Sequence, residues 1–470
     1  MSSYSISPKL KSNRVFILQK SELEKRFDPQ FYINRIKIKN SVKLSTLVKV
    51  KGGKRIQLGK YYSEIPTDFQ YLRVSDMKKF GLINWDGLKY IPEDVYIFLE
   101  RYKVEKGDVI ISIAGTVGKT ALIEKDFKNT ILTENCAILE IRDKSKLLPK
   151  YLHILLELST SKRQIELGFI QTTIPKLGFD KIEQLQLPAI PFLDKQIEII
   201  GLYDKSFAQK QKNQAEAQKL LASIDDYLLK ELEITLPTPP ENTLKNRMFK
   251  ITFNKVTGQR IDPNFHKQIY TDIINAIKKV PNQTLSKLIQ FSNETWDQQS
   301  IFEDEFPYIE ISEIDISTGL VNKIIETEKA NSPSRAKMIV RFGDILVSTT
   351  RPSRGAISFY NQSTEISIAS TGFAVLREVS KIKVLPEYLW FVLRNKICLI
   401  QMEQRSSGGN YPAIAQEELG NILIPVPPLS KQKEIANHIT GIRQQAQQLK
   451  DKTKELLKKA SEEIEKILLT

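Results

Sequence analysis

The chain has 470 residues, of which 41% are hydrophobic, and its 70 Lys and Arg against 55 Asp and Glu give a formal net charge of +15. At roughly 150 residues per domain, this length predicts about three domains. The hydrophobic content excludes a disordered basic tail. A folded chain with this excess of positive charge is expected to bind an anionic partner, with nucleic acid the first candidate and an acidic protein or a membrane surface the others.

The two cysteines, Cys136 and Cys398, lie far apart and belong to no Cys-x-x-Cys pair or Cys/His cluster. The sequence therefore predicts neither a disulfide framework nor a zinc site. The most apolar stretch, residues 388–400, is interrupted by Arg394 and Lys396, whereas a membrane helix needs roughly 18 apolar residues in succession. Because no apolar signal segment opens the sequence, we expect a cytoplasmic protein without a membrane partner.

The two halves of the chain repeat one another. Residues 71–77 (YLRVSDM) return as residues 308–314 (YIEISEI), a shift of 237 positions (308 − 71). Further matches follow in the same order, at shifts between 234 and 237: Asp28-Pro29 with Asp262-Pro263, Gly107-Asp108 with Gly343-Asp344, Leu148-Pro149 with Leu385-Pro386, Leu187-Pro188 with Ile424-Pro425, and Lys195-Gln196 with Lys431-Gln432. An ordered set of matches at nearly constant spacing indicates duplication. The unit is far longer than a solenoid repeat, so it predicts two similar domains.

Each half shows the same predicted order of elements. Short runs rich in β-branched residues, 108–113 and 344–348, predict strands. Helical patterns follow at 151–164 and 388–404, each two residues after a proline. Next come a polar loop, a proline-containing strand (185–191 and 422–428) and a long helix (194–233 and 433–470).

The long helices carry apolar stripes. In the second, the apolar residues are spaced mostly by threes and fours, as in a coiled coil: Ile435, Ile439, Ile442, Ala446, Leu449, Leu456, Ala460, Ile464 and Ile467. At ~1.5 Å per residue this helix reaches ~57 Å, too long for one small domain. We infer that the two helices form an antiparallel pair; a homodimeric coiled coil is the alternative. Pro237 to Pro240 are predicted to end the first of them.

The sequence thus predicts an α+β fold with two tandem β-rich globular domains, separated by an antiparallel pair of long helices and related by a pseudo-twofold internal repeat. The predicted boundaries are 1–190 for the first domain, 191–236 for the first long helix, 237–428 for a linker and the second domain, and 429–470 for the second long helix.

Motifs for catalysis are not visible. Residues 115–120 (GTVGKT) resemble a phosphate-binding loop, but only two residues separate the glycines where four are needed. No Gly-x-Gly-x-x-Gly follows a strand, no amino-methyltransferase tetrapeptide occurs, and His153, His266 and His438 are scattered. The sequence therefore predicts a binding protein with no cofactor and no metal. Residues 115–120 are read either as a plain turn between strands or as a turn that faces a polyanion.

Residues 424–432 (IPVPPLSKQ) open the second long helix, and residues 187–196 (LPAIPFLDKQ) are their weaker counterpart. With the tandem arrangement, these segments resemble the specificity subunits of type I restriction-modification systems over essentially the whole chain. The resemblance implies two target recognition domains, each reading one half of a bipartite asymmetric DNA sequence, and no catalytic activity. It also implies double-stranded DNA, modification (adenine methyltransferase) subunits, two for each chain, and restriction/translocase subunits as partners. Lys431, and an insertion with Phe192 and Lys195, depart from the usual Pro-Pro-Leu-x-Glu-Gln pattern and put the partner contacts in doubt.

Two groups of residues are candidates for DNA contacts. Basic loop residues suit phosphates: Lys51, Lys54, Arg55, Lys78 and Lys79 in the first half, Arg335 and Lys337 in the second. Polar residues on loops suit base edges: Thr116, Lys119, Gln171, Thr172 and Thr173 in the first half, and Arg351, Arg354, Ser406, Ser407, Asn410 and Tyr411 in the second. Ser353 belongs to the turn that is the candidate for facing a polyanion, and Gly408 and Gly409 would let the backbone approach the duplex closely. For each, a solvated loop side chain is the alternative. Trp85 and Trp296 offer rings for base stacking, with packing in the core as the favoured alternative.

Two hypotheses of different classes follow. The first is a DNA sequence-specificity subunit. The second is a non-enzymatic coiled-coil scaffold whose positive charge only aids solubility. Binding to duplex DNA with a steep dependence on salt separates them, because only the first neutralises phosphates.

Overall fold

The computed structural model describes residues 17–18, 20, 23, 29–34, 36, 38–57, 59–78, 81–125, 129–168, 175–238, 240–241, 243–253, 260–362 and 366–469. The chain divides into two compact units. The first unit comprises Met1–Gln211 and Thr453–Thr470, and the second comprises Lys212–Lys452. The boundaries between the units fall inside the two long helices, so each unit contains part of both.

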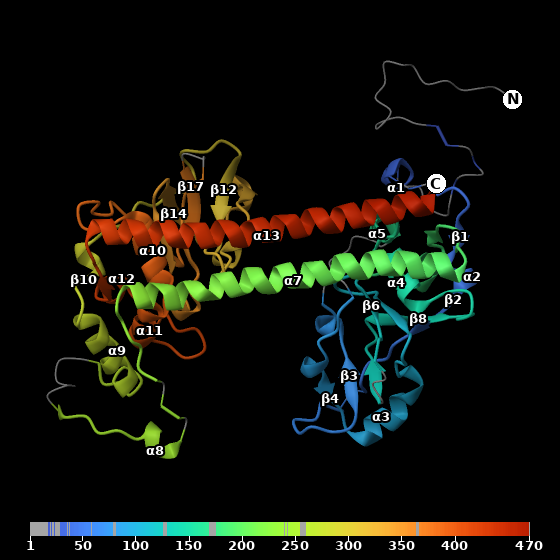
Figure 1. The fold of residues 1–470 in the computed structure, drawn as a ribbon, viewed down its shortest axis with the longest axis horizontal. Coiled ribbons are helices and arrows are strands. Elements are labelled where there is room, and N and C mark those ends of the chain that lie inside the picture. The colour runs from blue at the N-terminus through green and yellow to red at the C-terminus, as the bar shows by residue number, and fades with distance from the viewer. Residues whose placement is uncertain are drawn as a thin grey trace. The chain divides into compact units, whose positions relative to one another are not determined.

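In the part of the chain that the structure describes, the strands of the first unit form three small sheets; Figure 1 labels several of these strands. The strands are β1 (Val42–Lys43), β2 (Val48–Gly52), β3 (Gln70–Leu72), β4 (Lys89–Tyr90), β5 (Val109–Ser112), β6 (Thr120–Leu122), β7 (Thr130–Leu132), β8 (Cys136–Ile141) and β9 (Gln186–Leu187). They form a four-stranded sheet in the order β2-β8-β5-β6, a three-stranded sheet β4-β3-β7, and the pair β1-β9. The short helices are α1 (Pro29–Asn34), α2 (Leu44–Leu47), α3 (Glu93–Leu99), α4 (Pro149–Glu157), α5 (Ser159–Gly168) and α6 (Phe179–Glu183).

The second unit repeats this plan. Its strands are β10 (Asn282–Thr284), β11 (Gln290–Ser292), β12 (Glu305–Ile309), β13 (Ile325–Glu328), β14 (Ala336–Arg341), β15 (Ile345–Ser348), β16 (Ile357–Phe359), β17 (Ile366–Ser370), β18 (Phe373–Arg377) and β19 (Leu423–Pro425). The sheet orders are β11-β18-β15-β16, β13-β12-β17-β14 and β10-β19. The short helices are α8 (Leu244–Arg247), α9 (Gln268–Lys278), α10 (Pro386–Arg394), α11 (Lys396–Arg405) and α12 (Gln416–Gly420).

Nine strands of the second unit match the nine strands of the first in pairing and order, and β14 is the one addition within the described residues, which confirms the duplication read from the sequence. Among the paired strands of the described residues, each unit has one parallel pair, β3 with β7 and β12 with β17, at the same place in the order. The matched Gly-Asp pairs have the same local structure: Gly107 and Gly343 have φ of 90° and 91°, values that favour glycine. Asp108 and Asp344 each accept a hydrogen bond of 2.8 Å from the backbone N–H three residues earlier.

The predicted helices 151–164 and 388–404 were wrong in one respect, because each is two helices. Pro149 and Pro386 stand in the first turn of α4 and α10, as predicted. At Leu158 and Asn395 the backbone turns extended, with ψ of 153° at both, and α5 and α11 begin anew. The Asn395 side chain accepts a hydrogen bond from the Ile397 N–H and so caps α11.

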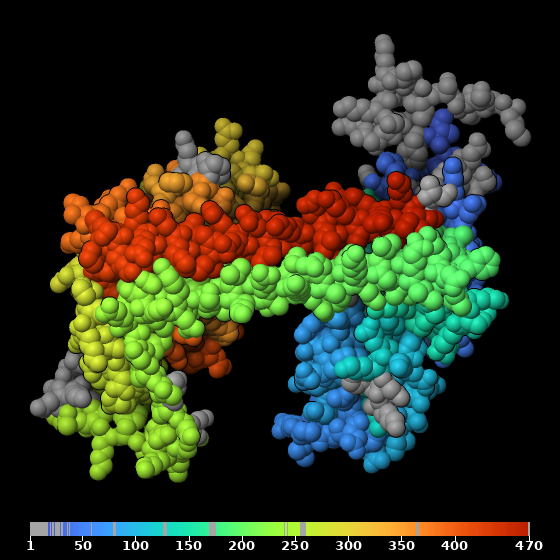
Figure 2. Space-filling view, in the orientation of Figure 1, coloured from blue at the N-terminus to red at the C-terminus, as the bar shows by residue number. Residues whose placement is uncertain are grey.

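The long helices are α7 (Leu193–Glu231) and α13 (Leu429–Leu469). Within each unit they lie side by side and in direct contact (Figures 1 and 2). In the second unit, Lys431 at the start of α13 forms an ion pair with Glu231 at the end of α7, and the rings of Tyr227 and His438 stack at 4.0 Å. In the first unit, Ile199 of α7 packs in one cluster with Ile464 of α13. The antiparallel pair within one chain is thereby confirmed.

The end of α7 differs from the prediction. The helix stops at Glu231, before Pro237 is reached. Glu233 has φ of 55°, and the N–H of Ile234 bonds back to the carbonyl of Leu229 at 2.9 Å. Leu232 and Ile234 are buried in the core of the second unit. A left-handed residue with apolar anchors on both sides therefore ends the helix, as is common at helix C-termini.

Two buried glutamines join the long helices to the globular parts. The Gln196 side chain accepts a hydrogen bond from the Leu148 N–H at 2.9 Å and donates to the carbonyls of Lys146 and Pro191. Gln432 makes the same three bonds in the second unit, to Leu385, Lys383 and Pro427. The repeated Lys-Gln pair of the sequence thus has a structural role, in which the glutamine fixes the start of each long helix against the start of α4 or α10.

Candidate nucleic-acid interface

In the second unit, the two predicted base-reading segments lie together. The N–H of Arg351 donates to the carbonyl of Pro412 at 2.7 Å, and the N–H of Ile414 donates to Thr349 at 2.9 Å. Residues 407–413 form a small loop closed by the pairing of Ser407 with Ala413. The connection between β15 and β16, which includes the short 3-10 helix Pro352–Arg354, therefore stands beside this loop.

Arg351 holds the loop rather than pointing freely outward. Its Nη2 donates to the carbonyl of Asn410 at 2.8 Å, and its guanidinium lies 4.2 Å from the ring centroid of Tyr411. The ring of Tyr411 is 70% exposed. Ser407, Gly408, Gly409, Asn410 and Arg354 are exposed as well, and Ser353 and Ser406 are half-buried. Arg351 thus supports the exposed Asn410 and Tyr411 of the loop, and Arg354 is exposed beside them.

A third segment, which the sequence analysis missed, lies beside these two. The three segments together form a polar edge of the second unit. The turn between β17 and β18 contains Thr371 and Gly372. The N–H of Thr349 donates to Gly372 at 2.8 Å, and the N–H of Thr371 donates to the carbonyl of Arg335 at 2.8 Å. Arg335 and Lys337 are both exposed. The predicted phosphate contacts of the second half therefore continue the same edge as its predicted base contacts.

The first unit has the same edge. The N–H of Ile113 donates to Asn135 in the turn between β7 and β8 at 2.8 Å, and the N–H of Leu177 donates to Ile113 at 2.9 Å. Residues 113–119 connect β5 to β6, so the segment that resembles a phosphate-binding loop is a turn between strands. Thr116 is exposed there, and Gly118 and Gly355 both have positive φ, 82° and 77°.

The other predicted residues of the first half are placed as follows. Lys54 and Arg55 are exposed and follow β2, and Lys78 is exposed. Lys119 is half-buried, and its Nζ donates to the carbonyl of Met77 at 3.2 Å, so it links the turn to residues 74–78. Lys79, Gln171, Thr172 and Thr173 lie outside the described residues. The joining turns were missed because residues 133–135 (TEN) and 370–372 (STG), at a shift of 237, share no identical residue.

Tryptophans do not contribute to this edge in the described structure. Trp296 is 2% exposed and packs against Phe302 and Phe306, and Trp85 is half-buried beside an apolar cluster of the first unit. The favoured packing alternative therefore applies to both.

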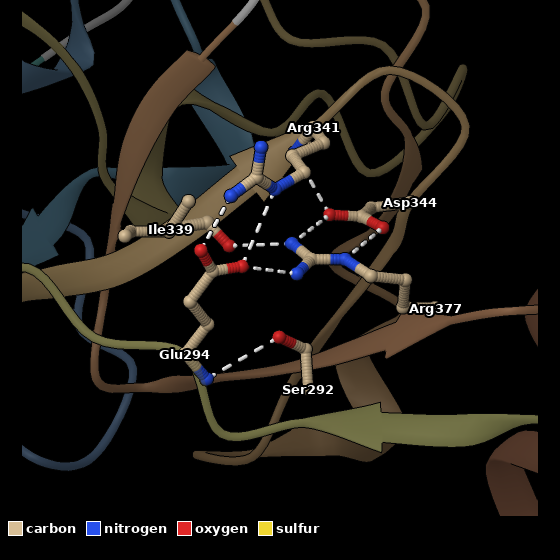
Figure 3. A network of polar contacts seen from close by, with 6 residues as sticks. All are labelled: Ser292, Glu294, Ile339, Arg341, Asp344 and Arg377. Carbon is tan, nitrogen blue, oxygen red and sulfur yellow. Dashed lines mark hydrogen bonds and ion pairs between the residues drawn. The ribbon is translucent and has the colours of Figure 1, made fainter.

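A polar network fixes the far end of β14, the strand that begins beside Arg335 (Figure 3). The Arg377 guanidinium lies between two carboxylates: it donates to Asp344 at 2.8 and 3.0 Å and to Glu294 at 2.5 Å. Its Nη2 also donates to the carbonyl of Ile339 at 3.0 Å. Hydrogen bonds from Arg341 and Arg377 outweigh partial burial and lower the pKa of Glu294. Through these contacts Arg377 of β18 holds the end of β14 in place.

Sites for metal or nucleophilic chemistry are not evident in the described residues. No cluster of three or more His, Cys, Asp or Glu side chains there could hold a metal ion. The thiols of Cys136 and Cys398 are both buried, and burial raises the pKa of Cys136 to about 12. A search of the same residues for a helix long and apolar enough to cross a membrane found none.

Comparison with known proteins places both halves of the repeat in one family. Residues 36–221 and 278–459 match the family described as type I restriction modification DNA specificity domain. The chain is 31% identical over 134 residues to the type I restriction enzyme HindI specificity subunit of Haemophilus influenzae, covering 27% of this chain and 29% of that protein. It is 21% identical over 164 residues to the EcoBI specificity subunit of Escherichia coli, covering 35% and 34%. Each match thus spans about a third of the relative's length.

Solved structures of low identity also align with the chain. The S subunit of a type I restriction-modification system from M. genitalium aligns over 91% of this chain and 95% of that chain, with 15% identity and a TM-score of 0.41. A chain from a study of complex assembly and conformational transition of the type I system aligns over 92% and 98%, with 17% identity and a TM-score of 0.44.

The two segments that match the family together make up more than half of the chain, and they fall one in each half of the repeat. This chain therefore belongs to the type I restriction-modification DNA specificity family.

Proposed function

We propose that this chain is the non-catalytic specificity subunit of a type I restriction-modification complex, and that each unit reads one half of a bipartite target in double-stranded DNA. The observation that carries the proposal is the repeated edge. In the first unit, a backbone hydrogen bond of 2.8 Å from Ile113 to Asn135 joins the turn after β5 to the turn before β8. In the second unit, a bond of the same length from Thr349 to Gly372 joins the turn after β15 to the turn before β18. The same polar edge is thus available once in each unit, as the reading of two half-sites requires.

The side chains on the two edges differ, which supports an asymmetric target. The turn between β7 and β8 carries Glu134 and Asn135, where its counterpart carries Thr371 and Gly372. The turn after β5 carries Thr116 and Lys119, where its counterpart carries Arg351, Ser353 and Arg354. Different donors and acceptors on the same backbone frame select different base edges.

The partners belong to the same proposal. We infer that the chain recruits modification subunits, two for each copy, which methylate adenine, and restriction/translocase subunits. The chain then supplies target selection, and the partner subunits supply the chemistry with their own cofactors.

Methylation mapping tests the function. Cells that express the chain together with its modification subunits should carry methylated adenine at one bipartite motif, and deletion of the chain should remove that methylation. Replacing the first globular part with that of another family member should change one half of the motif and leave the other half intact. Methylation that persists unchanged without the chain would contradict the proposal.

Binding of the purified chain to duplex DNA supplies the second test. If several lysines and arginines neutralise phosphates, the logarithm of the binding constant falls steeply and linearly with the logarithm of the salt concentration. A scaffold whose charge serves solubility would show no such binding.

A further inference from the structure

Arg55 is an exposed arginine with a fixed orientation. It follows β2 in the first unit, and its side chain is 77% exposed. An exposed arginine normally samples many rotamers, and a single surface ion pair holds it weakly. Here Nε donates to Oε1 of Glu134 at 2.6 Å, while Nη1 and Nη2 have no hydrogen-bond partner among the described residues. The two terminal nitrogens of the guanidinium are therefore available to a ligand.

Glu134 is itself held in place, unlike the partner in an ordinary surface ion pair. Its Oε2 accepts hydrogen bonds from Thr133 Oγ1 at 2.9 Å and from the Tyr71 hydroxyl at 3.2 Å. That hydroxyl shares its single proton between Glu134 and the carbonyl of Lys54, which is the nearer acceptor at 2.8 Å, so the network returns to the residue next to Arg55. Burial alone would raise the pKa of Glu134, but the hydrogen bonds from Arg55 and its neighbours leave it lowered. The carboxylate is thus a fixed support for the guanidinium.

The guanidinium stands at the edge of a polar pocket of about 340 Å³. Tyr62, Arg73, Ser75 and Asn135 are among its other lining residues. Asn135 belongs to the repeated edge, where its carbonyl accepts the hydrogen bond from Ile113. The pocket therefore lies within the proposed DNA-contacting edge and leaves room in front of Nη1 and Nη2 of Arg55, which form the two prongs of a fork.

The charges of this pocket are balanced. Arg55 is paired with Glu134, and Arg73 donates to the buried Asp76 through Nε at 3.0 Å and Nη2 at 2.7 Å. Binding of a phosphate relies on positive charges that are not already neutralised by a carboxylate, as in a basic groove. A neutral ligand edge with hydrogen-bond acceptors fits two compensated arginines better, because it needs donors at fixed positions and no net charge.

The second unit has no equivalent of this fork. Strand pairing places Lys51 opposite Ile138 in the first unit and Ser292 opposite Val375 in the second, and Ile138 and Val375 are at a shift of 237. Arg55 lies four positions after Lys51, and Trp296 lies four positions after Ser292, so Trp296 takes the place of Arg55 in the second unit. Its ring is buried, and its Nε1 donates to the carbonyl of Ser300 at 2.6 Å. At the matched position among the described residues of the second unit, no arginine is present.

We propose that Arg55 is a base-reading residue that recognises the guanine of a G·C pair in the half-site bound by the first unit, with Glu134 as its positioning residue. A guanidinium held through Nε presents Nη1 and Nη2 side by side, and this fork matches the O6 and N7 acceptors of guanine in the major groove. The proposal rests on the proposed function of the chain and assigns one contact within it.

The test is methylation mapping with the full chain and its modification subunits. We compare the wild type with Arg55→Gln and with Arg163→Gln, a control in which a half-buried arginine on α5 loses its ion pair with Glu166. The wild-type motif should contain a G·C pair at a position that Arg55→Gln no longer selects, with discrimination at that position reduced roughly 10- to 100-fold. All other positions should be unchanged, and Arg163→Gln should reproduce the wild-type motif.

Glu134→Ala tests the positioning role. It removes the support while Arg55 remains, so selectivity should weaken at the same position and nowhere else. A merely structural role would instead lower methylation at all sites alike. If Arg55→Gln methylates the wild-type motif with unchanged selectivity, or if the half-site of the first unit contains no G·C pair, the inference is overturned while the specificity function stands. If the wild type directs no bipartite methylation, the proposed function itself fails.

Discussion

His153 is a buried histidine of α4 in the first unit, 5% exposed, and its Nε2 has no hydrogen-bond partner among the described residues. A Cβ on Gly81 would come within 2.2 Å of that nitrogen, so the glycine leaves the space that the imidazole fills. The second unit has Trp390 at the matching position, buried in α10. The sequence could not tell a packed histidine from a functional one, because both sit on an apolar helix face.

Burial lowers the pKa of His153 below its usual value of 6.5. The unfolded chain therefore takes up a proton before the folded chain does, and stability is lost as the pH falls below 6.5 toward the folded-state pKa. We predict that the urea midpoint of the wild type decreases between about pH 8 and about pH 5 more steeply than that of His153→Gln, which cannot titrate. Parallel profiles for the wild type and His153→Gln would refute this account.

Among the elements, the division of each predicted helix into two is explained by contacts with the long helices. In the first unit, Glu465 of α13 accepts hydrogen bonds from Ser159 Oγ at 2.6 Å and from the Thr160 N–H at 3.2 Å, at the start of α5. In the second unit, the capping residue Asn395 donates to Asp225 of α7 at 2.8 Å. Each second short helix thus begins where a long helix supplies an acidic side chain to its N-terminus, the favourable place for one.

We predict that Glu465→Ala lowers the stability of the first unit by about 1 kcal/mol, the usual cost of losing a helix N-cap. Hydrogen exchange measured by mass spectrometry should show faster exchange at the start of α5, with the second unit unaffected. Glu463→Ala is the matched control, since Glu463 is an exposed acid two residues away on the same helix. Equal effects of the two substitutions would mean that the hydrogen bonds to Ser159 and Thr160 contribute nothing.

Which elements could be predicted depended on how local their causes are. The repeat, the strands at 108–113 and 344–348 and the long helices follow from periodicity and β-branched runs, which a sequence shows directly. The break at Asn395 depends on Asp225, 170 positions away, and the end of α7 depends on the burial of Leu232 and Ile234. The candidate site divided in the same way: exposed basic loops were visible, whereas the joining turns at Asn135 and Gly372 follow only from strand pairing.

For the whole molecule, each core is completed by residues from distant parts of the chain. Ile199 of α7 and Ile464, Ile467 and Leu468 of α13 pack in the core of the first unit. Ile435 of α13 and Leu228 of α7 pack in the core of the second. These residues are repeat equivalents, since Ile199 and Ile435 differ by 236 positions, as do Leu228 and Ile464. Each unit therefore uses the start of one long helix and the end of the other.

This reciprocity predicts that matched substitutions act in opposite units. Ile464 is 1% exposed and Leu228 is fully buried. Truncating either side chain leaves a cavity that costs about 2–5 kcal/mol. Ile464→Ala should therefore raise hydrogen exchange in β8 and α4 of the first unit and leave β18 and α10 unchanged, although Ile464 belongs to the second half of the sequence. Leu228→Ala should do the reverse.

Binding to half-sites can show whether the end of α13 belongs to the first unit or acts with the second half of the sequence. If each unit reads its own half-site, Ile464→Ala at raised temperature should weaken binding through the first half-site and spare the second. A duplex altered only in the first half-site should then bind the wild type and the variant almost equally, whereas a duplex altered only in the second should reveal the full deficit. A loss that follows sequence position instead, with Ile464→Ala affecting the second half-site, would show that the end of α13 does not complete the core of the first unit.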